Sequence, residues 1–541
     1  MWVTLAGPLI LWLNRSQWFF LDDWNFVLQR DGGDLASVFA PHWGHNTALP
    51  ILVYRALFNL VGVRSYVPYQ LPVVALHLIV ATQMRILMRR SGVDAWLATA
   101  GGVVFLFLGS GRSNLAWGFQ LTMTGSIVGG LGALVVLTNG LRTALPPAQT
   151  PRPGDATTSN DVPHDGSAVR HVGPAPSGRR IGAAALLLVV SVLCSNVAIP
   201  MLVLVGFVAY MLHGRQIAIL AVLPAVVVYS VWMLLAPVSE NVAATAGPLE
   251  AAKFAVRTAS GSLVGLTTWW PLAVLVVGCA ITGALRLLRT LGEGDRRRLV
   301  VPLGFTIMVP VLALMIGRAR GIHDENAPTA SRYVYLNVVM LLIPLMVALS
   351  ELVRDRDRRW HLAMCMIVLA WLPGNLYRVG PNTDAERRRL GDRDGLIYLA
   401  DVAPTLDLPA GDEILVDVTV GDLAMLRRDA GLPAPSPGLD DREMRSRATV
   451  VLLLRAQATD VENCRPVPAG EPLPLQAGQV LAFAGPQRLT HLLGGEPGVT
   501  LRWQAETRAQ RTARVHGDIT VSFEPIEAGG VELCDPVVPF L

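Results

Sequence analysis

Residues 216–236 read QIAILAVLPAVVVYSVWMLLA and contain no Asp, Glu, Lys or Arg. An α-helix rises about 1.5 Å per residue, so about 20 apolar residues cross the hydrocarbon core of a bilayer. Similar apolar runs are found at about 66–88, 95–109, 118–141, 181–212, 271–289, 299–317, 333–352 and 360–377. The sequence therefore predicts a mainly α-helical, polytopic membrane bundle.

Two of the apolar stretches depart from the simple pattern. The run 181–212 is long enough for two short spans that meet at Ser195-Asn196 and Pro200, so we interpret it as a hairpin. Residues 1–13 are apolar but reach only about 20 Å as a helix, and no basic region or cleavage site indicates a signal peptide. We interpret them as the end of a first membrane helix, which brings the expected number of spans to about eleven.

Composition agrees with a membrane protein. Of 541 residues, 52% are hydrophobic and 16% are charged, whereas a soluble domain carries roughly 25% charged residues. A disordered chain, a disulfide-stapled miniprotein and an ordinary cytosolic enzyme are excluded. The formal net charge of +4 gives no basic face of the kind that nucleic acid requires, and no nucleic-acid partner is expected.

The positions of the arginines predict the orientation. Dense clusters fall in alternating loops, and such loops are usually cytoplasmic. The opposite loops, at 14–64, 109–117, 237–269 and 317–332, are then extracytoplasmic. The sequence predicts a plasma-membrane protein with a cytoplasmic N-terminus and an extracytoplasmic C-terminal region. The clusters include Arg85, Arg89, Arg90, Arg179, Arg180, Arg286, Arg289, Arg296–Arg298, Arg354, Arg356, Arg358 and Arg359.

Two regions outside the apolar runs differ in kind. Residues 143–178 are rich in Pro, Gly, Ser, Thr and Asp, which predicts a disordered cytoplasmic loop. Residues 381–541 contain short β-like runs between Gly/Pro turns, which predicts a β-rich extracytoplasmic domain after a membrane domain at 1–380. The β-like runs are Glu413–Val420, Thr449–Leu454, Val480–Ala484, Thr500–Trp503 and Asp518–Phe523.

Cysteine use fits this division of the chain. Cys194, Cys279 and Cys365 lie in apolar runs and are expected to be buried small hydrophobic residues. Cys464 and Cys534 both lie in the expected outer domain, where the compartment permits a disulfide. We expect these two to form a structural bridge.

The first outer loop, 14–48, contains the most distinctive polar residues. It includes Trp18-Phe19-Phe20-Leu21-Asp22-Asp23-Trp24-Asn25-Phe26, in which two adjacent carboxylates are set among aromatic residues. Acidic side chains at a membrane surface need compensation for their lost hydration. One interpretation is a helix N-cap at Asp22 or Asp23, with the helix running to about Arg30, and the tryptophans as interfacial belt residues. A catalytic role fits the residues equally well.

The order of the segments resembles a known superfamily. The segments 20–24, 41–45 (PHWGH), 49–55 (LPILVYR) and 64–70 (RSYVPYQ) look like those of uncharacterised actinobacterial members of the GT-C superfamily of integral-membrane glycosyltransferases. This superfamily includes protein mannosyltransferase-like families. The resemblance covers about 1–380 and implies a GT-C-like membrane domain.

The resemblance also implies a reaction. In these enzymes an acidic residue of the first outer loop acts as base on an acceptor hydroxyl, which attacks a hexose or pentose carried on polyprenyl phosphate, usually with inversion. The acceptor is an extracytoplasmic cell-wall glycan, lipid or protein. A carboxylate suits the role because the attacking hydroxyl loses its proton. Asp22 or Asp23 is the expected base, and the other is a hydrogen-bonding partner or metal ligand.

The lipid-phosphate leaving group requires cations in the outer loops, because arginine can bind phosphate through paired donors. Arg332, Arg318 and Arg320 are the candidates. Arg332 opens an apolar run beside Tyr333, which is a candidate substrate contact. The alternative for each arginine is an interfacial side chain that extends to the membrane surface.

Other polar residues of the outer loops could contact substrate. His42 and His45 are three residues apart and Asn46 follows; with the aspartates they could hold a divalent metal ion. Some relatives in the superfamily depend on a metal and others do not. Pro41 and Gly44 favour a turn instead, with hydrogen bonding to acceptor or phosphate. Trp117 and Gln120 could line a sugar site or serve packing.

Two other classes of function compete with the transferase. A transporter or flippase of lipid-linked sugars would show inverted repeats and ionisable residues within the spans; His77 is one such residue, but the halves show no evident repeat. A catalytically inactive scaffold that recruits partners through the outer domain is the third interpretation.

Overall fold

The computed structural model describes residues 2–30, 34–140, 176–236, 246–290, 296–320, 327–379, 383–406, 408–415, 417–456, 461–493, 496–504, 511–526 and 529–536. Most of the loop predicted to be disordered, 143–178, lies outside these residues. The chain divides into two compact units. The first unit comprises Met1–Arg15, Gly33–Val53 and Tyr69–Asn382, and the second comprises Ser16–Gly32, Tyr54–Pro68 and Thr383–Leu541.

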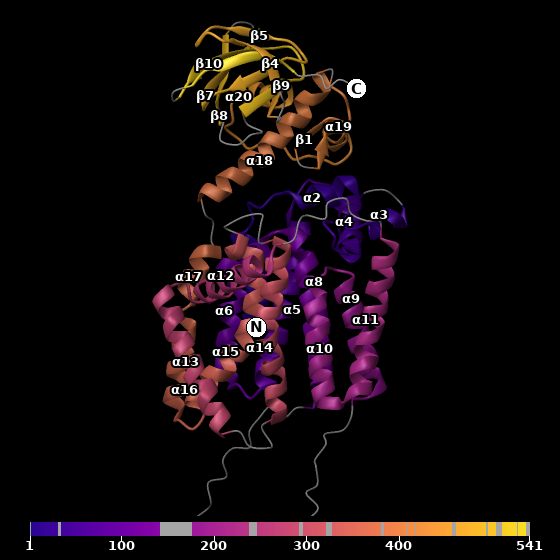
Figure 1. Ribbon diagram of the computed structural model, residues 1–541, viewed down its shortest axis with the longest axis vertical. Helices are drawn as coiled ribbons and strands as arrows, with labels where there is room; N and C mark the ends of the chain where they lie inside the picture. The colour runs from indigo at the N-terminus through magenta and orange to yellow at the C-terminus, as the bar shows by residue number, and fades with distance from the viewer. Residues whose placement is uncertain are drawn as a thin grey trace, which may run out of the picture. The chain divides into compact units, whose positions relative to one another are not determined.

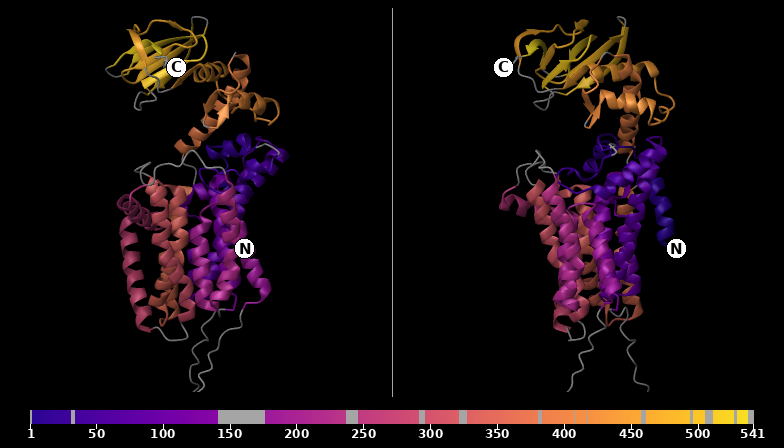
Figure 2. Two further views of the ribbon diagram at one scale, coloured as in Figure 1. Left: turned by 45° about the vertical axis from the view of Figure 1, so that its right-hand side comes forward. Right: turned by 90° about the vertical axis from the view of Figure 1, so that its right-hand side faces the viewer.

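Helices make up most of the described part of the first unit. Figure 1 shows most of its long helices side by side and roughly parallel, and both views of Figure 2 show the same arrangement. The helical elements of this unit are α1 (Trp2–Leu13), α3 (Leu35–Phe39), α5 (Val67–Arg90), α6 (Ala95–Leu106), η2 (Gly109–Gly111), α7 (Ser113–Ala116), η3 (Gly118–Gln120), α8 (Leu121–Leu137), α9 (Gly178–Val192), α10 (Ala198–His213), α11 (Arg215–Leu235), α12 (Pro248–Thr267), α13 (Trp270–Thr290), α14 (Arg296–Arg320), η4 (Ala327–Thr329), α15 (Ser331–Val353), α16 (Arg358–Leu369) and α17 (Leu372–Val379). Helix α4 (Ala48–Val61) contains residues of both units.

Seven helical stretches in the described part of the chain are long and apolar enough to cross a membrane. The expected spans at α6, α9 and α10 form shorter helices of 12, 15 and 16 residues, below the length of about 20 that a bilayer core requires. The seven stretches are Val67–Arg90, Gly118–Leu137, Arg215–Leu235, Trp270–Thr290, Arg296–Arg320, Ser331–Val353 and Arg358–Val379.

The hairpin expected within 181–212 forms as α9 and α10. Small residues bring α8 close to α9: the side chain of Ser191 donates to the carbonyl oxygen of Ser126 at 2.6 Å, and Ser126 Oγ donates to that of Ser191 at 2.9 Å. A Cβ atom added at Gly129 would lie 2.5 Å from the carbonyl oxygen of Leu187. The absence of a side chain at Gly129 therefore permits this close helix packing.

The second unit combines the C-terminal region with two earlier segments of the chain. The sequence had assigned all of 14–48 to the membrane domain, whereas residues 16–32 and 54–68 pack with 383–541. The backbone N–H of Val63 donates to the carbonyl oxygen of Ala430 at 3.0 Å. Gly62 precedes it with a φ of +59°, and a Cβ at that position would lie 2.3 Å from the same oxygen. A glycine is required there for both reasons.

The C-terminal part of this unit is rich in β-structure, as the β-like runs predicted, and its strands form a β-sandwich. One sheet has the order β5-β10-β7-β8 and the other β3-β9-β6-β11-β4, and β1 and β2 form a separate hairpin. Along β10, Ile519, Val521 and Phe523 are buried and alternate with more exposed residues, which is the period-two pattern of a strand with one buried face. Phe523 meets Phe483 of the other sheet, with ring centroids 5.9 Å apart.

Helices and strands of the second unit have these bounds: α2 (Asp22–Trp24), η1 (Asn25–Gln29), α18 (Thr383–Val402), η5 (Ala403–Thr405), β1 (Glu413–Leu415), β2 (Val418–Thr419), α19 (Val420–Arg428), α20 (Asp441–Leu453), β3 (Leu454–Ala456), β4 (Val461–Pro466), β5 (Leu473–Leu475), β6 (Val480–Phe483), β7 (Gln487–Leu493), β8 (Glu496–Trp503), β9 (Thr512–Val515), β10 (Ile519–Pro525) and β11 (Val531–Pro536). Within the sandwich Cys464 of β4 and Cys534 of β11 are joined by a disulfide bond. The disulfide bond that the sequence predicts between these two cysteines is thus present in the structure.

The prediction of a strand at Thr449–Leu454 is wrong, because these residues form the last turns of α20 up to Leu453. Asp440 caps this helix and accepts the backbone N–H groups of Arg442 and Glu443 at 2.9 and 3.2 Å. Val450 and Leu453 then bury their side chains in the sandwich core.

Candidate functional site

The two adjacent carboxylates have different environments. Asp23 has no exposed surface. Its Oδ2 accepts hydrogen bonds from Tyr66 Oη at 2.7 Å and from the backbone N–H of Phe20 at 3.0 Å, and its Oδ1 accepts from Tyr54 Oη. Three donors therefore compensate the hydration that this carboxylate loses on burial. Asp22 is only half-buried, so its carboxylate is the one of the pair that solvent can reach.

A tight turn positions the pair. Leu21 has a φ of +44°, a region that β-carbon-bearing residues rarely adopt. The turn continues into the short helix α2, where the N–H of Asp23 donates to the carbonyl oxygen of Phe20 at 3.1 Å. In the sequence an aspartate was expected to cap the amides that follow it; Asp23 instead accepts the N–H of Phe20, which precedes it. The helical segment α2–η1 ends at Gln29, close to the expected Arg30.

Aromatic side chains surround this segment. The ring of Phe19 lies 4.8 Å from that of Tyr66 and 5.2 Å from that of Trp24, and Phe26 meets Tyr54 edge-on at 5.3 Å. Trp18 is 7% exposed and Trp24 is 6% exposed, so both contribute to the core of the second unit rather than to an exposed belt. The aromatic residues fix the two tyrosines that hold Asp23.

Asp417, from the C-terminal region, forms hydrogen bonds with the helical segment α2–η1. Asn25 Nδ2 donates to Asp417 Oδ1 at 3.2 Å, and Gln29 Nε2 donates to the carbonyl oxygen of Asp417 at 3.4 Å. Burial is the main reason that the pKa of Arg30 is lowered; Asp417 raises it, and Arg55 lowers it further. The helical segment α2–η1 thus begins with two acidic residues and ends next to Arg30, which lies near both a negative charge, Asp417, and a positive charge, Arg55.

The two candidate histidines belong to the first unit and form a turn, as Pro41 and Gly44 indicated. The backbone N–H of His42 donates to the carbonyl oxygen of His45 at 3.0 Å, and the reverse bond measures 2.9 Å. Trp43 and Gly44 between them have φ values of +48° and +76°. This geometry excludes the shared helical face considered for the pair. The side chain of Asn46 is buried, and its Oδ1 accepts from the N–H of Ala48 at the start of α4.

Trp117 and Gln120 lie at a polar and aromatic site in the same unit. Phe119 joins Trp117 and His42, with ring centroids 5.1 and 5.4 Å away. Gln120 is fully buried, and its Oε1 accepts from Asn114 Nδ2 at 3.2 Å. Neither Gln120 Nε2 nor Asn114 Oδ1 has a hydrogen-bond partner among the described residues. Buried polar atoms are normally paired, so these two atoms are available to a polar ligand.

Arg332 and Tyr333 begin α15 next to this site. The hydroxyl of Ser331 accepts the backbone N–H of Ser113 in α7 at 2.9 Å. The guanidinium carbon of Arg332 lies 5.2 Å from the centroid of the Tyr333 ring. Arg332 Nε is buried and has no hydrogen-bond partner in the described part of the chain.

Arg318 and Arg320 differ from Arg332 in their surroundings. Arg318 Nη1 donates to the carbonyl oxygen of Ala246 at 2.6 Å, and the N–H of Ala246 returns a bond of 2.9 Å to the carbonyl oxygen of Arg318. Arg318 therefore holds the segment before α12. Arg320 is the last residue of α14.

In the second unit, Asp22 and Asp23 lie with Tyr54, Tyr66 and Asp417. In the first unit, His42 and Trp117 are joined through Phe119, and Gln120 pairs with Asn114. Arg332 and Tyr333 lie together at the start of α15. The tyrosines that bind Asp23 were not singled out from the sequence, although both lie in segments that carried the resemblance. No local sequence pattern could have identified Asp417 as a neighbour of this segment, because 392 residues separate it from Asn25.

One cluster of three metal-ligand side chains is found among the described residues: Cys464, Glu532 and Cys534. Both sulfur atoms belong to the disulfide, so they offer no thiolate to a metal ion. Comparison of the chain with protein families, with curated proteins and with solved structures finds no match.

Proposed function

We propose that this chain is a membrane glycosyltransferase that moves a sugar from a polyprenyl-phosphate donor to a hydroxyl of an extracytoplasmic glycan, lipid or protein. The observation that carries the proposal is the difference between two neighbouring carboxylates. Asp23 is buried and held by two tyrosine hydroxyls, whereas Asp22 on the same short helix is half-buried. A buried carboxylate that holds the turn, next to a second carboxylate that solvent can reach, is a suitable arrangement for a general base.

In this proposal Asp22 is the base and Asp23 is a positioning residue. The carboxylate of Asp22 takes the proton of the acceptor hydroxyl as its oxygen bonds to the anomeric carbon. The bond from that carbon to the phosphate oxygen breaks, polyprenyl phosphate leaves, and the configuration inverts. In the first unit, Arg332 is the candidate for binding phosphate, because its Nε is buried without a partner among the described residues, and Gln120 and Tyr333 are the candidate sugar contacts.

The proposed orientation follows the arginines. The ends of the helices at Arg89-Arg90, Arg286 and Arg296–Arg298 would face the cytoplasm, and the second unit would lie outside. The shorter helices α1, α6, α9 and α10 would complete about eleven crossings. Seven helical stretches of membrane length among the described residues support a multi-pass protein.

The test compares Asp22→Asn with Asp23→Asn in membranes supplied with a labelled polyprenyl-phosphate sugar. General-base catalysis contributes about 10²–10⁴-fold, so Asp22→Asn should reduce transfer at least about 100-fold while the midpoint of thermal unfolding stays unchanged. Asp23→Asn should lower that midpoint as well. Glu471→Gln, which changes an exposed carboxylate of the second unit, is the control and should transfer at the wild-type rate.

The competing function is a transporter of lipid-linked sugars, for which His77 is the relevant observation. This histidine is fully buried in α5, and its ring nitrogens lie 2.9 Å from Tyr335 Oη and 3.1 Å from the carbonyl oxygen of Leu106. Both ring nitrogens of His77 thus have hydrogen-bond partners within the helical bundle. Movement of intact lipid-linked sugar between leaflets by the wild-type protein, without transfer to an acceptor, would decide for the transporter.

A further inference from the structure

Helix α12 (Pro248–Thr267) lies in the stretch 237–269, for which the sequence predicts an outer loop. Its 20 residues are enough to cross a bilayer core. They include Glu250, Lys253 and Arg257, however, and α12 is not among the seven stretches that are both long and apolar enough to do so. Its direction relative to the membrane-length helices therefore needs explanation.

Both halves of α12 contact the same end of the bundle. In the first half, the carbonyl oxygen of Ala251 lies 2.6 Å from the position that a Cβ of Gly317 would occupy, near the end of α14. In the second half, a Cβ at Gly265 would lie 3.1 Å from Val334 Cγ1, near the start of α15. These contacts are about 21 Å apart along α12. The helix therefore crosses the end of the bundle, where Figure 1 shows it.

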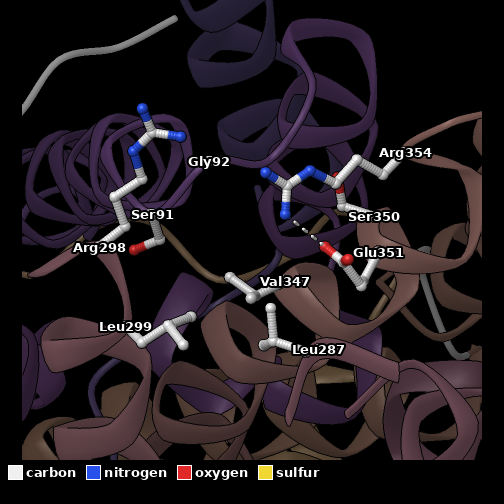
Figure 3. Close-up of a pocket in the computed structure, with 9 residues that line it drawn as sticks. All are labelled: Ser91, Gly92, Leu287, Arg298, Leu299, Val347, Ser350, Glu351 and Arg354. Carbon is white, nitrogen blue, oxygen red and sulfur yellow. Dashed lines mark hydrogen bonds and ion pairs between the residues drawn. The ribbon is translucent and has the colours of Figure 1, made fainter. Parts of the chain in front are cut away.

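Charged residues gather at the opposite end of α14 and α15. Arg298, Glu351 and Arg354 line a cavity of about 40 Å³ there (Figure 3), and Glu351 pairs with Arg354 at 3.3 Å. Glu351 lies about 17 residues after Val334, which is about 26 Å along a helix. A hydrocarbon core is about 30 Å thick and is costly to charged side chains. These residues and α12 thus lie at the two boundaries of a layer of membrane thickness.

One face of α12 is buried in the bundle. The ring of Phe254 meets that of Tyr333, with centroids 6.2 Å apart, and Thr258 and Ser262 continue the same face without exposed surface. Residues spaced by four lie along one side of a helix. This side fixes α12 to the protein, and the other side faces outward.

The outward side is divided into an apolar and a basic stripe. Leu249 and Val256 are 67% and 70% exposed, and Leu263 continues their stripe at the same spacing. Lys253 and Arg257 are exposed beside it. At about 100° per residue, the two stripes lie about 80° apart around the helix. An apolar stripe next to a basic one is typical of a helix that lies in a membrane interface.

The chain that follows α12 supports contact with lipid. Trp269 and Trp270, at the junction with α13, are both exposed, and tryptophan is enriched where a membrane meets water. Helix α13 has membrane length, and its exposed residues include Val274 and Leu275. The apolar stripe of α12 is thus continuous along the chain with a surface that suits acyl chains.

The charges of the outward side favour an anionic headgroup. Lys253 pairs with Glu250 at 2.8 Å, whereas the described part of the chain provides no ion pair for Arg257. The helix therefore has one net positive charge, at an exposed position. A guanidinium can bind phosphate oxygens through paired donors.

We propose that α12 is an in-plane helix of the lipid headgroup layer. Leu249, Val256 and Leu263 insert among the upper acyl chains, and Arg257 binds the phosphate group of an anionic lipid. The proposal does not depend on the transferase function, because it concerns the contact of α12 with the bilayer and is tested without sugar transfer.

The first experiment measures the depth of α12 in the membrane. The full chain carries Cys279→Ser, which removes the partly exposed free cysteine; the other two free cysteines are buried. It is placed in nanodiscs of phosphatidylglycerol and phosphatidylcholine, and a nitroxide is attached to one introduced cysteine. Relaxation of the nitroxide by oxygen and by a water-soluble nickel chelate gives its depth. The parent protein without an introduced cysteine should take up no label.

An in-plane helix keeps both its ends at one level, so nitroxides at Leu249→Cys and Leu263→Cys should lie at the same depth. A helix that crosses the membrane would separate them by about 21 Å. The nitroxide at Val256→Cys should be more accessible to oxygen, and that at Arg257→Cys to the chelate. Unequal depths at the two leucine positions, or preferential access of the chelate to both Val256→Cys and Arg257→Cys, would overturn the proposal.

The second experiment tests the anionic ligand. A bimane label at Ser260→Cys, an exposed position three residues from Arg257, is quenched by brominated phosphatidylglycerol or by brominated phosphatidylcholine in nanodiscs. We expect stronger quenching by the anionic lipid, and Arg257→Gln should reduce this preference about fivefold.

Arg289→Gln is the matched control, because it removes an exposed arginine near the C-terminal end of α13. It should leave the preference within about twofold of its original value. Equal quenching by the two lipids when both arginines are present, or equal effects of the two arginine variants, would overturn the assignment of an anionic lipid.

Discussion

The hydroxyl of Tyr66 donates a 2.7 Å hydrogen bond to Oδ2 of the fully buried Asp23. Tyr54 donates to the other oxygen of the same carboxylate. Both tyrosines belong to the segment Tyr54–Pro68, so they tie the acidic turn to the chain that follows it. The neighbouring Asp22 is held in place by this arrangement while its own side chain stays half-buried.

Removing the Tyr66 hydroxyl should therefore destabilise the second unit. Tyr66→Phe leaves a buried carboxylate oxygen with one donor fewer, and hydrogen bonds to charged groups contribute about 1.5–3 kcal/mol. The free energy of unfolding, measured by chemical denaturation, should fall by about this amount. Tyr377→Phe, at a side chain that is 88% exposed, should change it by less than about 0.5 kcal/mol. Equal effects of the two variants would contradict the structural role of Tyr66.

Arg332→Gln should weaken use of the donor. If the guanidinium binds the lipid phosphate, its loss removes a charge-assisted hydrogen bond, and the KM for the labelled donor should rise about tenfold or more. Arg289→Gln removes an exposed arginine near the C-terminal end of α13 and serves as the control. A KM that is unchanged in Arg332→Gln would exclude this arginine from the phosphate site.

Reduction of the Cys464–Cys534 bond should destabilise the sandwich. The bond closes a loop with a sequence separation of 70 residues, and loop-closure entropy for such a length amounts to about 4 kcal/mol, with measured values commonly about 2–4 kcal/mol. Denaturation with and without reductant should show the difference. Cys464→Ser should behave like the reduced protein, and Cys279→Ser, at a free cysteine, should still respond to reductant.

Stability of the second unit should fall in mild acid because of His491. Burial lowers the pKa of this histidine, although its hydrogen bond with Ser446 opposes the shift. The folded state therefore favours the neutral ring, and its contribution is complete above the unfolded pKa of about 6.5. It is lost as the pH falls below that value, by at most about 1.4 kcal/mol per pH unit. His491→Gln should show a flatter dependence between pH 7 and 5; parallel curves for the two proteins would exclude His491 as the cause.

Local patterns predicted the helical bundle well. The hairpin of α9 and α10 followed from two polar residues and a proline within a long apolar run. The run Thr449–Leu454 was misread as a strand because short β-branched and apolar stretches suit a buried helix turn as well. The capping residue Asp440, which lies nine positions before this run, carried the decisive signal for a helix.

The candidate site was predictable only in part. Asp22 and Asp23 stand out in the sequence because two adjacent carboxylates are set among aromatic residues. Their different environments depend on Tyr54 and Tyr66, which approach through folding of α4 and the turn after it. Asp417 depends on a contact across most of the chain, for which neither periodicity nor composition gives a sign.

The bond between Asn25 and Asp417 also has a consequence for biosynthesis. A ribosome adds about 5–20 residues per second, so the 392 positions between them take about 20–80 s to translate. During that interval the acidic turn has emerged but lacks its last neighbour. The segment around Asp22 can reach its final form only after Asp417 has been translated, so a product that stops before Asp417 would carry the carboxylates without their finished surroundings.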